Sequence, residues 1–578
     1  MSPIDLHLPR FRYGPHWVVE RIWGIERAFG RAKAEGRAED DTRLRIFFVL
    51  ALFACIFLGL AIGAAHSALF AEGDRSGVEG AAPGARADLV DRNGQLLAAD
   101  LPHYGLYYDP KENWNPDEIR RVLPTVVPEL TRDRLEKALR ADKRQYLIGG
   151  LTPADRDRID DLGLPGISFE PEPKRAYLLG PTAGHLIGFV DRGGVGLSGA
   201  ELALDKEIRA DAGKGPVALS IDLRVQAALQ DEVEKTAREF NAQGAAGIVT
   251  DVHTGEILGM VSYPDFDPNT AGAQQANMVN HMAASDYEPG SVFKVFTLAM
   301  AIDSGLVTVN SVMDTTTPLI IGGKQVHDDE RANHNYPLWE VFTQSSNVGA
   351  ARLGMMAGTD RLVRYFHNFG LFGAAPSELR ESARPIVPSR FTDTSTAYMS
   401  FGQAISESPL NVATGINAIV NGGLYVPLTI RKLAPGDLPQ GRRVISETTS
   451  RTMLDLMRLN AQIGTGKGAD NAAPGYRVGG KTGTAQKAID GHYAAGHRVS
   501  SFAAVFPTDG AIDGKRYLVF ILLDDPQPSK DSGGFAMAAQ TAAPTAGRVI
   551  ERIAPILGVK RAPAVPVTLA VPSAHSGR

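Results

Sequence analysis

Cysteine is almost absent from this chain of 578 residues, which contains only Cys55. A single cysteine excludes disulfide bonds within the chain and any zinc site built from thiolates. An excess of basic residues is also lacking, because the formal net charge is −5 and the isoelectric point is near 6.3. This charge balance gives no reason to expect a nucleic-acid partner. With 44% apolar and 22% charged residues, the composition is that of a globular protein with large hydrophobic cores.

Metal-binding patterns are missing as well. The sequence has no H-E-x-x-H motif, which places two histidines on one helical face to hold zinc. Histidine and carboxylates gather at His327-Asp328-Asp329, and His492 and His497 form a second candidate group. Both groups stand in polar segments without the spacing of a helical metal site, so we interpret them as solvated loops. We interpret His185 as a packed residue of the N-terminal module.

Long apolar runs are rare, and only one has the length of a membrane span. Residues 46–65 read IFFVLALFACIFLGLAIGAA and carry no charge; as a helix they extend about 30 Å, the thickness of a bilayer core. Basic residues gather at 31–45, whereas the next one is Arg75, so the positive-inside rule places residues 1–45 in the cytoplasm. A cleaved signal peptide is the alternative, because small residues surround Ala65. The long leader and long apolar run favour an uncleaved anchor.

The rest of the chain shows two differently patterned parts. A Gly/Ala-rich linker at 71–85 precedes alternating apolar residues around Asn93-Gly94, which predict a hairpin over 86–100. Between 115 and 170 the pattern predicts short helices at 116–123, 132–140 and 153–162, and strands near 145–149 and 166–171. From residue 219 onward it predicts a long amphipathic helix at 222–240 and two strands over 244–264 around His253-Thr254-Gly255. The Pro/Ala-rich C-terminus has no core pattern and predicts a disordered tail.

A lysine stands inside a segment that otherwise predicts a buried helix. In EPGSVFKVFTLAM, residues 288–300, Lys294 lies one turn after Ser291 on the same face. Pro289-Gly290 ends the preceding segment, so Ser291 falls near a helix N-terminus, where backbone N–H groups favour developing negative charge. Burial among phenylalanines would lower the pKa of Lys294 toward neutrality, so that the amine can take the serine proton. The alternative is a helix-capping serine followed by a lysine that extends to solvent.

A second polar group lies in FTQSSNVGAARLG, residues 342–354. Ser345, Ser346 and Asn347 form a short turn between two helical patterns. Ser345 and Asn347 can there offer hydrogen bonds that hold Lys294 and pass its proton. Taken alone, the turn has the simpler interpretation of a helix cap.

A third group lies in YRVGGKTGTAQKA, residues 476–488, in a strand-like setting. It contains Lys481-Thr482-Gly483-Thr484, preceded by Gly479 and Gly480. A glycine inside a strand allows another backbone to approach closely, and a lysine beside it can hold a substrate carboxylate. Taken alone, the motif has the simpler interpretation of a hairpin lysine.

The order of the three motifs decides between these interpretations. S-x-x-K, then S-x-N, then K-T-G is the set found in serine β-lactamases and penicillin-binding proteins, with S-D-N as the usual middle motif. This chain has Ser345-Ser346-Asn347 in the middle position. Three weak signals in the required order favour a serine enzyme that forms an acyl intermediate.

From about Arg86 to Gly558 the sequence resembles the class B penicillin-binding proteins, and most closely their division-specific peptidoglycan D,D-transpeptidases of the FtsI type. Residues 86–94 are similar to the family motif R-G-x-x-x-D-R-N-G, with alanine for the first glycine. Residues 175–191, 196–208 and 247–269 resemble further family motifs. SSNVG is more similar to the division type than to the elongation type, which usually has Asp in place of Asn347. An elongation-type transpeptidase is the nearest alternative.

The resemblance implies an α+β penicillin-binding fold, similar to serine β-lactamases, with an antiparallel sheet flanked by helices. A membrane anchor and an elongated N-terminal pedestal module are expected to precede it. The implied domains are a cytoplasmic tail at 1–45, a transmembrane helix at 46–66, a periplasmic linker and pedestal at 67–218, a transpeptidase domain at 219–558 and a disordered tail at 559–578.

The family mechanism transfers onto the motif residues. It implies that Ser291 attacks the penultimate D-Ala carbonyl of a pentapeptide stem and expels the terminal D-Ala, with Lys294 as activating base assisted by Ser345 and Asn347. An amine of a neighbouring stem then converts the acyl-enzyme into a cross-link. The residues expected to bind the donor carboxylate are Lys481, Thr482, Gly483 and Thr484. The backbone N–H groups of Ser291 and Thr484 would form the oxyanion hole, and no metal or organic cofactor is needed.

The resemblance also implies partners and a location. The expected partners are peptidoglycan pentapeptide stems, lipid-linked nascent strands, β-lactams, a SEDS-family glycosyltransferase and other divisome membrane proteins. The expected location is the inner membrane at the septum, crossed once, with the N-terminus in the cytoplasm and the catalytic domain in the periplasm.

Other functions share part of this pattern. A membrane-anchored β-lactamase of class A needs a deacylating glutamate within E-x-x-L-N, and Glu407–Asn411 matches that motif. Ser408 and Pro409, however, predict the start of a helix there. A β-lactam sensor or a non-enzymatic divisome scaffold is the further alternative. Residues 66–240 show no glycosyltransferase glutamate site, which argues against a bifunctional class A protein.

Overall fold

The computed structural model describes residues 85–563 except 192, 274–276, 490–491 and 530–532, together with residues 27, 52–54, 56–58 and 60. The chain divides into two units, residues 1–76 and 77–578, and the elements below belong to the second. The predicted cytoplasmic tail, membrane span and C-terminal tail fall mostly outside the described residues. Of the residues that are described, none form a helix long and apolar enough to cross a bilayer.

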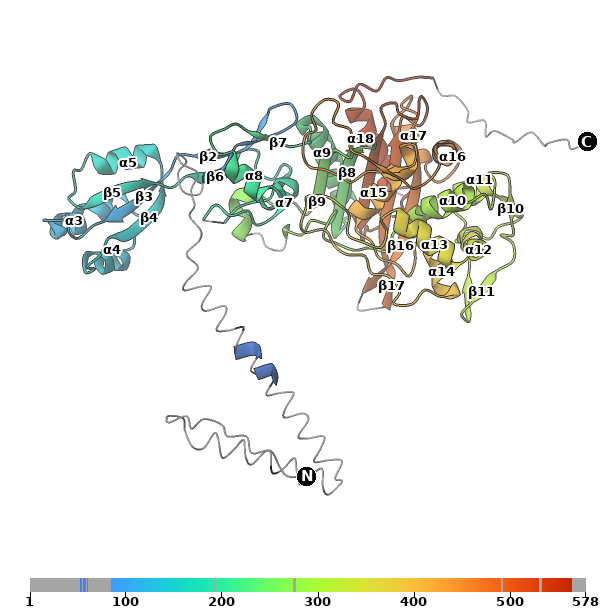
Figure 1. The fold of residues 1–578 in the computed structure, drawn as a ribbon, viewed down its shortest axis with the longest axis horizontal. Coiled ribbons are helices and arrows are strands. Elements are labelled where there is room, and N and C mark those ends of the chain that lie inside the picture. Colours follow the sequence, from blue (N-terminus) through green and yellow to red (C-terminus); the bar gives the residue numbers. More distant parts are fainter. Residues whose placement is uncertain are drawn as a thin grey trace, which may run out of the picture. The chain divides into compact units, whose positions relative to one another are not determined.

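A five-stranded antiparallel sheet forms the centre of the C-terminal part, as predicted (Figure 1). Its strands lie in the order β16-β17-β18-β8-β9. The predicted strand pair around His253-Thr254-Gly255 is confirmed as β8 and β9. The strand bounds are Gly244–Asp251 for β8, Ile257–Tyr263 for β9, Gly479–Ile489 for β16, His492–Phe506 for β17 and Tyr517–Asp524 for β18.

The sheet is covered on both faces, and β18 shows why its sequence is apolar throughout. Successive side chains of a strand point to opposite faces. In β18, Val519 and Ile521 pack with helices α9 (Leu223–Glu239) and α18 (Ala542–Ile553). Phe520 belongs instead to the larger core on the other face, which also holds the helix after Ser291. The predicted amphipathic helix at 222–240 is thereby confirmed as α9, with Asp222 capping its first turn.

The larger core is built mainly from helices inserted between β9 and β16. These are α10 (Lys294–Asp303), α11 (Leu338–Thr343), α12 (Asn347–Ala357), α13 (Thr359–Asn368), α14 (Asp393–Met399), α15 (Pro409–Val420) and α16 (Glu447–Ile463). Helix α17 (Lys467–Ala472) follows them and packs instead in the core on the α9 and α18 side of the sheet. Short elements connect them: η1 (Pro268–Ala273), η3 (Gly290–Phe293), β10 (Val312–Met313) with β13 (Tyr336–Pro337), β11 (Leu319–Ile321) with β12 (Lys324–Val326), and β14 (Leu424–Tyr425) with β15 (Arg442–Arg443).

The N-terminal part contains two smaller sheets. The predicted hairpin at 86–100 is confirmed as β1 and β2, in a sheet of order β6-β2-β1-β7. The predicted elements of 115–170 are also confirmed, and they pack around a separate sheet of order β4-β3-β5. The first sheet comprises β1 (Leu89–Val90), β2 (Leu96–Leu101), β6 (Lys174–Tyr177) and β7 (Val217–Ala218), beside helices α6 (Gly184–Ile187), α7 (Gly199–Ala203) and α8 (Asp205–Ala210). The second comprises β3 (Tyr104–Tyr108), β4 (Gln145–Leu151) and β5 (Ile167–Pro171), beside α3 (Pro116–Val126), α4 (Arg132–Leu139) and α5 (Pro153–Asp160).

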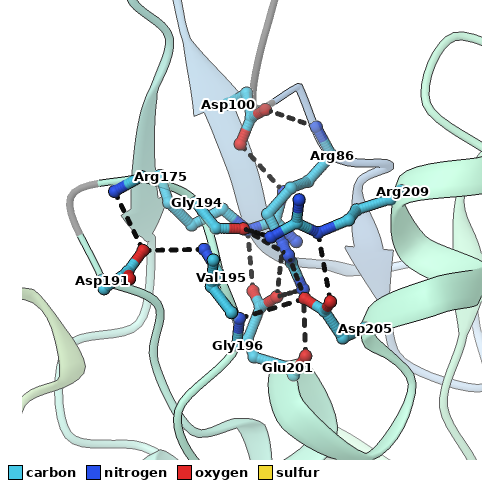
Figure 2. Close-up of polar contacts among 11 residues, drawn as sticks. Arg86, Asp100, Arg175, Asp191, Gly194, Val195, Gly196, Glu201, Asp205 and Arg209 are labelled. Carbon is cyan, nitrogen blue, oxygen red and sulfur yellow. Dashed lines mark hydrogen bonds and ion pairs between the residues drawn. The ribbon is translucent and has the colours of Figure 1, made fainter. Parts of the chain in front are cut away.

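A buried ionic network ties the first sheet to its helices (Figure 2). Glu201 is fully buried and accepts hydrogen bonds from Arg86 Nε at 2.8 Å and Arg175 Nε at 2.7 Å. Arg86 also contacts Asp205, and Asp100 accepts from both arginine residues. Removing one partner of such a network leaves an uncompensated buried charge. Arg86, the first residue of the R-x-x-x-x-D-R-N-G motif, therefore fixes the start of β1 to α7 and α8.

The prediction that His492 and His497 lie in a solvated loop is wrong. Both belong to β17, and His497 Nδ1 lies 2.8 Å from Asp525 Oδ2. The ladder between β16 and β17 continues to the pair Ile489 and His492. His492 and Tyr493 are exposed although they lie in the strand, so their polar pattern resembles that of a loop. The interpretation of His185 as a packed residue is confirmed, since it is 5% exposed.

Candidate active site

Ser291 lies in η3, immediately before α10, so the predicted helix start is confirmed. Val292, Phe293, Phe296 and their neighbours are fully buried, which anchors this helix in the core. Phe293 packs edge-to-face against Phe296 and Phe366, at centroid distances of 5.0 and 5.3 Å. The rigid helix start holds Ser291 half-buried, while Lys294 is completely enclosed.

Glycines bring the Ser291 segment close to strand β16. A Cβ on Gly483 would lie 2.7 Å from the Pro289 oxygen and 2.8 Å from Val292 Cγ2. The same segment is also approached from the end of α14, because a Cβ on Gly402 would lie 2.1 Å from the Gly290 oxygen. These contacts are too short for any side chain, so the K-T-G glycine is required by the close approach of two backbones. A Cβ on Gly479 would likewise lie 2.9 Å from the Arg458 backbone nitrogen, which confirms the expected close approach at the start of this strand.

The turn formed by Ser345, Ser346 and Asn347 connects α11 to α12. Ser345 has a φ of 60°, in the left-handed region that non-glycine residues rarely occupy. Such a conformation costs about 1–3 kcal/mol and persists only when its surroundings enforce it. Here it directs both the carbonyl and the hydroxyl of Ser345 to Lys294 Nζ.

Lys294 is the centre of the polar contacts. Its Nζ lies 2.9 Å from Ser291 Oγ, 3.1 Å from Ser345 Oγ and 2.8 Å from Asn347 Oδ1. The structure thus brings the first two sequence motifs together as predicted. The lysine amine is within proton-transfer distance of the serine hydroxyl.

Lys481 joins this group from β16. Its Nζ donates to Ser345 Oγ at 2.9 Å, so that Ser345 bridges two lysines. Thr482 Oγ1 is held 2.7 Å from Thr465 Oγ1. Lys481 is fully buried and Thr482 is 7% exposed, whereas Thr484 lines the cleft. Of the predicted carboxylate-binding residues, Thr484 therefore faces the open space, and Lys481 lies behind it against Ser345.

Burial sets the charge of both lysines. Desolvation lowers the pKa of Lys294 to about 7, against the opposing charges of Asp328 and Asp329. Burial also lowers the pKa of Lys481 well below its usual range, and the neighbouring Lys294 lowers it further. A lysine with a pKa near 7 is in large part an unprotonated amine at neutral pH. It can therefore act as a base toward Ser291.

An open cleft of about 1150 Å³ gives access to Ser291. Its walls come from segments far apart in the sequence, including the β11–β12 region, α14, β16 and β17. The residues that line it together with Ser291 include Gly290, Asn347, Gln403, Ala404, Thr484 and Ala485.

Asp328 is the residue of this site that the sequence reading missed. Its carboxylate accepts hydrogen bonds from Ser346 Oγ at 2.6 Å and from the Val348 backbone at 3.0 Å. The interpretation of residues 327–329 as a solvated loop is therefore wrong for Asp328, which is half-buried. The only sequence signal was a carboxylate in a polar stretch near the S-x-N motif, and the contact itself depends on the tertiary fold.

Glu407 does not take part in the cleft. It is 1% exposed, burial raises the pKa of its carboxyl to about 9, and Asn411 donates to it. Ser408 caps α15 and Pro409 begins it, as predicted. The E-x-x-L-N match is thus the start of a buried helix, and Glu407 is not among the described residues that line the cleft.

Comparison with known proteins assigns the family. Residues 245–547 match the model of the penicillin-binding protein transpeptidase domain, and residues 81–236 match that of the penicillin-binding protein dimerisation domain. The chain is 51% identical to a probable peptidoglycan D,D-transpeptidase FtsI of Caulobacter vibrioides, over 97% of this chain and 96% of the relative. This chain belongs to the penicillin-binding proteins, as a peptidoglycan D,D-transpeptidase of the FtsI type.

Other penicillin-binding proteins support the same assignment at greater distance. The peptidoglycan D,D-transpeptidase FtsI of Escherichia coli K12 is 30% identical over 78% of this chain and 81% of its own. The crystal structure of penicillin-binding protein 3 from Mycobacterium tuberculosis has a TM-score of 0.65 and 26% identity, covering 85% of this chain and 99% of that one. The predicted class B resemblance and the mixed helix–sheet transpeptidase fold are thereby confirmed.

Proposed function

We propose that this transpeptidase cross-links stem peptides of septal peptidoglycan through an acyl-enzyme on Ser291. The observation that carries the proposal is the contact between Ser291 Oγ and the fully buried Lys294 Nζ, at 2.9 Å. The unprotonated amine takes the serine proton as the hydroxyl attacks the penultimate D-Ala carbonyl. Asn347 and Ser345 hold the amine in place, and Ser345 passes the proton onward toward the leaving D-Ala.

The donor peptide binds along the cleft with its terminal carboxylate at the K-T-G motif. Thr484 and Thr482 offer hydroxyls to that carboxylate, and Gly483 lets the strand lie against the Ser291 segment. Lys481 supplies positive charge from behind when it is protonated. The backbone N–H groups of Ser291 and Thr484 receive the oxyanion. An amine of a second stem then attacks the ester, which forms the cross-link and frees Ser291.

The location and partners follow the same proposal. Residues 46–66 anchor the chain in the inner membrane, residues 1–45 remain in the cytoplasm, and the pedestal and transpeptidase domains at 67–218 and 219–558 lie in the periplasm. A SEDS-family glycosyltransferase and other divisome membrane proteins contact the anchor and pedestal and deliver lipid-linked nascent strands. β-Lactams acylate Ser291 in place of the stem; the structure of penicillin-binding protein 3 from Mycobacterium tuberculosis was solved with aztreonam and with ampicillin.

The lifetime of a penicillin adduct tests this proposal against the β-lactamase alternative. A β-lactamase needs a base that hydrolyses its ester, and Glu407 is buried away from the cleft. After brief exposure to benzylpenicillin, we expect the intact mass to show one adduct that persists while unbound drug is removed. Clearance of the adduct within seconds would support hydrolysis and contradict the transpeptidase mechanism.

A further inference from the structure

Asp328 lies where three parts of the active site meet. It follows β12 in the sequence, lines the cleft, and reaches the N-terminus of α12. Its Oδ2 accepts from Ser346 Oγ at 2.6 Å, and its Oδ1 accepts from the backbone N–H groups of Asn347 and Val348. The backbone oxygen of the preceding residue, His327, accepts from Asn347 Nδ2 at 3.2 Å. The side chain of Asn347 is therefore held from the same segment that holds its backbone.

These contacts satisfy the start of α12. The first N–H groups of a helix have no partner within it. Asn347 and Val348 donate theirs to Asp328, while Gly349 donates to Ser346 Oγ at 3.0 Å. A carboxylate in this position is also favoured by the helix dipole. Ser346 is 1% exposed, so no water replaces the hydrogen bond it donates to Asp328.

The capped turn is the one that holds Lys294. Ser345 adopts its left-handed conformation directly before the residues that Asp328 binds. On the other side, Asn347 Oδ1 accepts from Lys294 Nζ at 2.8 Å. A strained residue stays in place only when its neighbours are fixed. The positions of Ser345 and Asn347, which both accept from Lys294, therefore depend on the segment that Asp328 clamps.

We propose that Asp328 is a positioning residue for acylation, which clamps the Ser345–Asn347 turn and sets the charge environment of Lys294. This inference rests on the proposed function, because it assigns Lys294 the role of base. Among the described residues, Asp328 forms no hydrogen bond with Ser291 or Lys294. It acts through the turn and through its negative charge.

The charge adds a second effect with a definite sign. Lys294 faces Lys481 from β16, and Asp328 and Asp329 from the segment after β12. The two aspartates favour the ammonium form of Lys294, so they raise its pKa against the effect of burial. Loss of the Asp328 charge therefore lowers the pKa of Lys294 further. The acylation rate falls on the acid side because the amine becomes protonated. With a lower pKa, this acid limb of the pH profile moves to lower pH.

The test compares Asp328→Asn with the wild-type protein by the rate of benzylpenicillin acylation across pH. We expect the rate on the alkaline plateau to fall about 10- to 100-fold, the cost of a small misplacement at a reacting group. We also expect the acid limb to move to lower pH. A role confined to folding would change the yield or melting temperature and leave the limb where it was.

Two variants separate the contacts from the charge. Asp329→Asn removes a nearby charge on an exposed side chain. Among the described residues Asp329 forms no hydrogen bond with the turn, so we expect a shift of the acid limb in the same direction with an unchanged plateau. Asp328→Glu keeps the charge but displaces the clamp, so we expect a lowered plateau with an acid limb close to wild type. Should Asp328→Asn not fold, Asp328→Glu alone decides: a wild-type plateau overturns the proposal.

The outcomes also separate this inference from the proposed function. If the wild-type protein forms no penicillin adduct, the transpeptidase mechanism fails and Asp328 is not at issue. If the wild type is acylated and Asp328→Asn shows the same plateau and the same acid limb, only the positioning role fails. A lower plateau together with a displaced limb supports both.

Discussion

Replacement of Ser291 by alanine is expected to abolish covalent labelling by a fluorescent penicillin. The substitution removes the hydroxyl that lies 2.9 Å from Lys294 Nζ, and no acyl-enzyme can form without that oxygen. The fold should survive, because the net contribution of one hydrogen bond to stability is only about 0.5–1.5 kcal/mol and Ser291 is half-buried. Labelling of the purified full-length chain, followed by gel fluorescence, measures the effect.

A serine at the other end of the same helix gives the matched control. Ser304 follows α10 and donates to the Met300 oxygen at 2.7 Å, away from the cleft. Ser304→Ala should label as the wild type does. Residual labelling of Ser291→Ala at a wild-type level would mean that the penicillin reacts at another residue.

Replacement of Lys294 by arginine should be nearly as severe. The guanidinium keeps its proton in proteins, so it cannot act as a base at the buried position that Lys294 occupies. A positioned base contributes about 10²- to 10⁴-fold to the rate, and we expect the acylation rate to fall by that factor. Lys294→Met removes the amine with little change in volume and should show a similar loss. Stopped-flow acylation by a chromogenic cephalosporin measures both.

The control makes the same exchange at a lysine outside the Ser291 contacts, on β16 rather than on α10. Lys487 forms an ion pair with Asp524 at 2.7 Å and lies partly exposed. Lys487→Arg retains that ion pair and should acylate at the wild-type rate. If the rate of Lys294→Met fell by less than about tenfold, short of the roughly 10²-fold minimum expected for a lost base, another group would have to activate Ser291.

Most of the fold was predictable from local patterns. The hairpin around Asn93-Gly94, the helices and strands of 115–170 and the capped helix after Asp222 each carry turn, cap or periodicity signals within a few residues. The strand β18 has no alternation because both of its faces are buried. Its place between β17 and β8 depends on contacts between distant segments.

The three motifs predicted which residues meet, but not how. The approach of Ser345 to both Lys294 and Lys481 arises from three segments that only the tertiary fold brings together. The sequence indicated that Lys481 holds a substrate carboxylate, and the structure adds that this lysine is buried while Thr484 lines the cleft. The left-handed conformation of Ser345 carries no local signal, since serine normally avoids it.

Asp328 shows the limit of motif reading most clearly. A polar segment with a histidine and two aspartates is most often a solvated loop, and residues 327 and 329 are exposed. Only the packing of the segment after β12 against the start of α12 turns Asp328 into a cap. In the same way, the polar residues around His497 suggested a loop, although backbone pairing continues through them.

The pH dependence of wild-type acylation by benzylpenicillin tests most directly whether burial makes Lys294 the base. Protonated Lys294 cannot accept the serine proton, so the rate should rise as pH increases through the pKa of about 7 and then level off. Below that pH the rate should fall about tenfold per unit. A midpoint near 7 that disappears in Lys294→Met supports the mechanism. A midpoint near the ordinary lysine value of about 10.4 would contradict it.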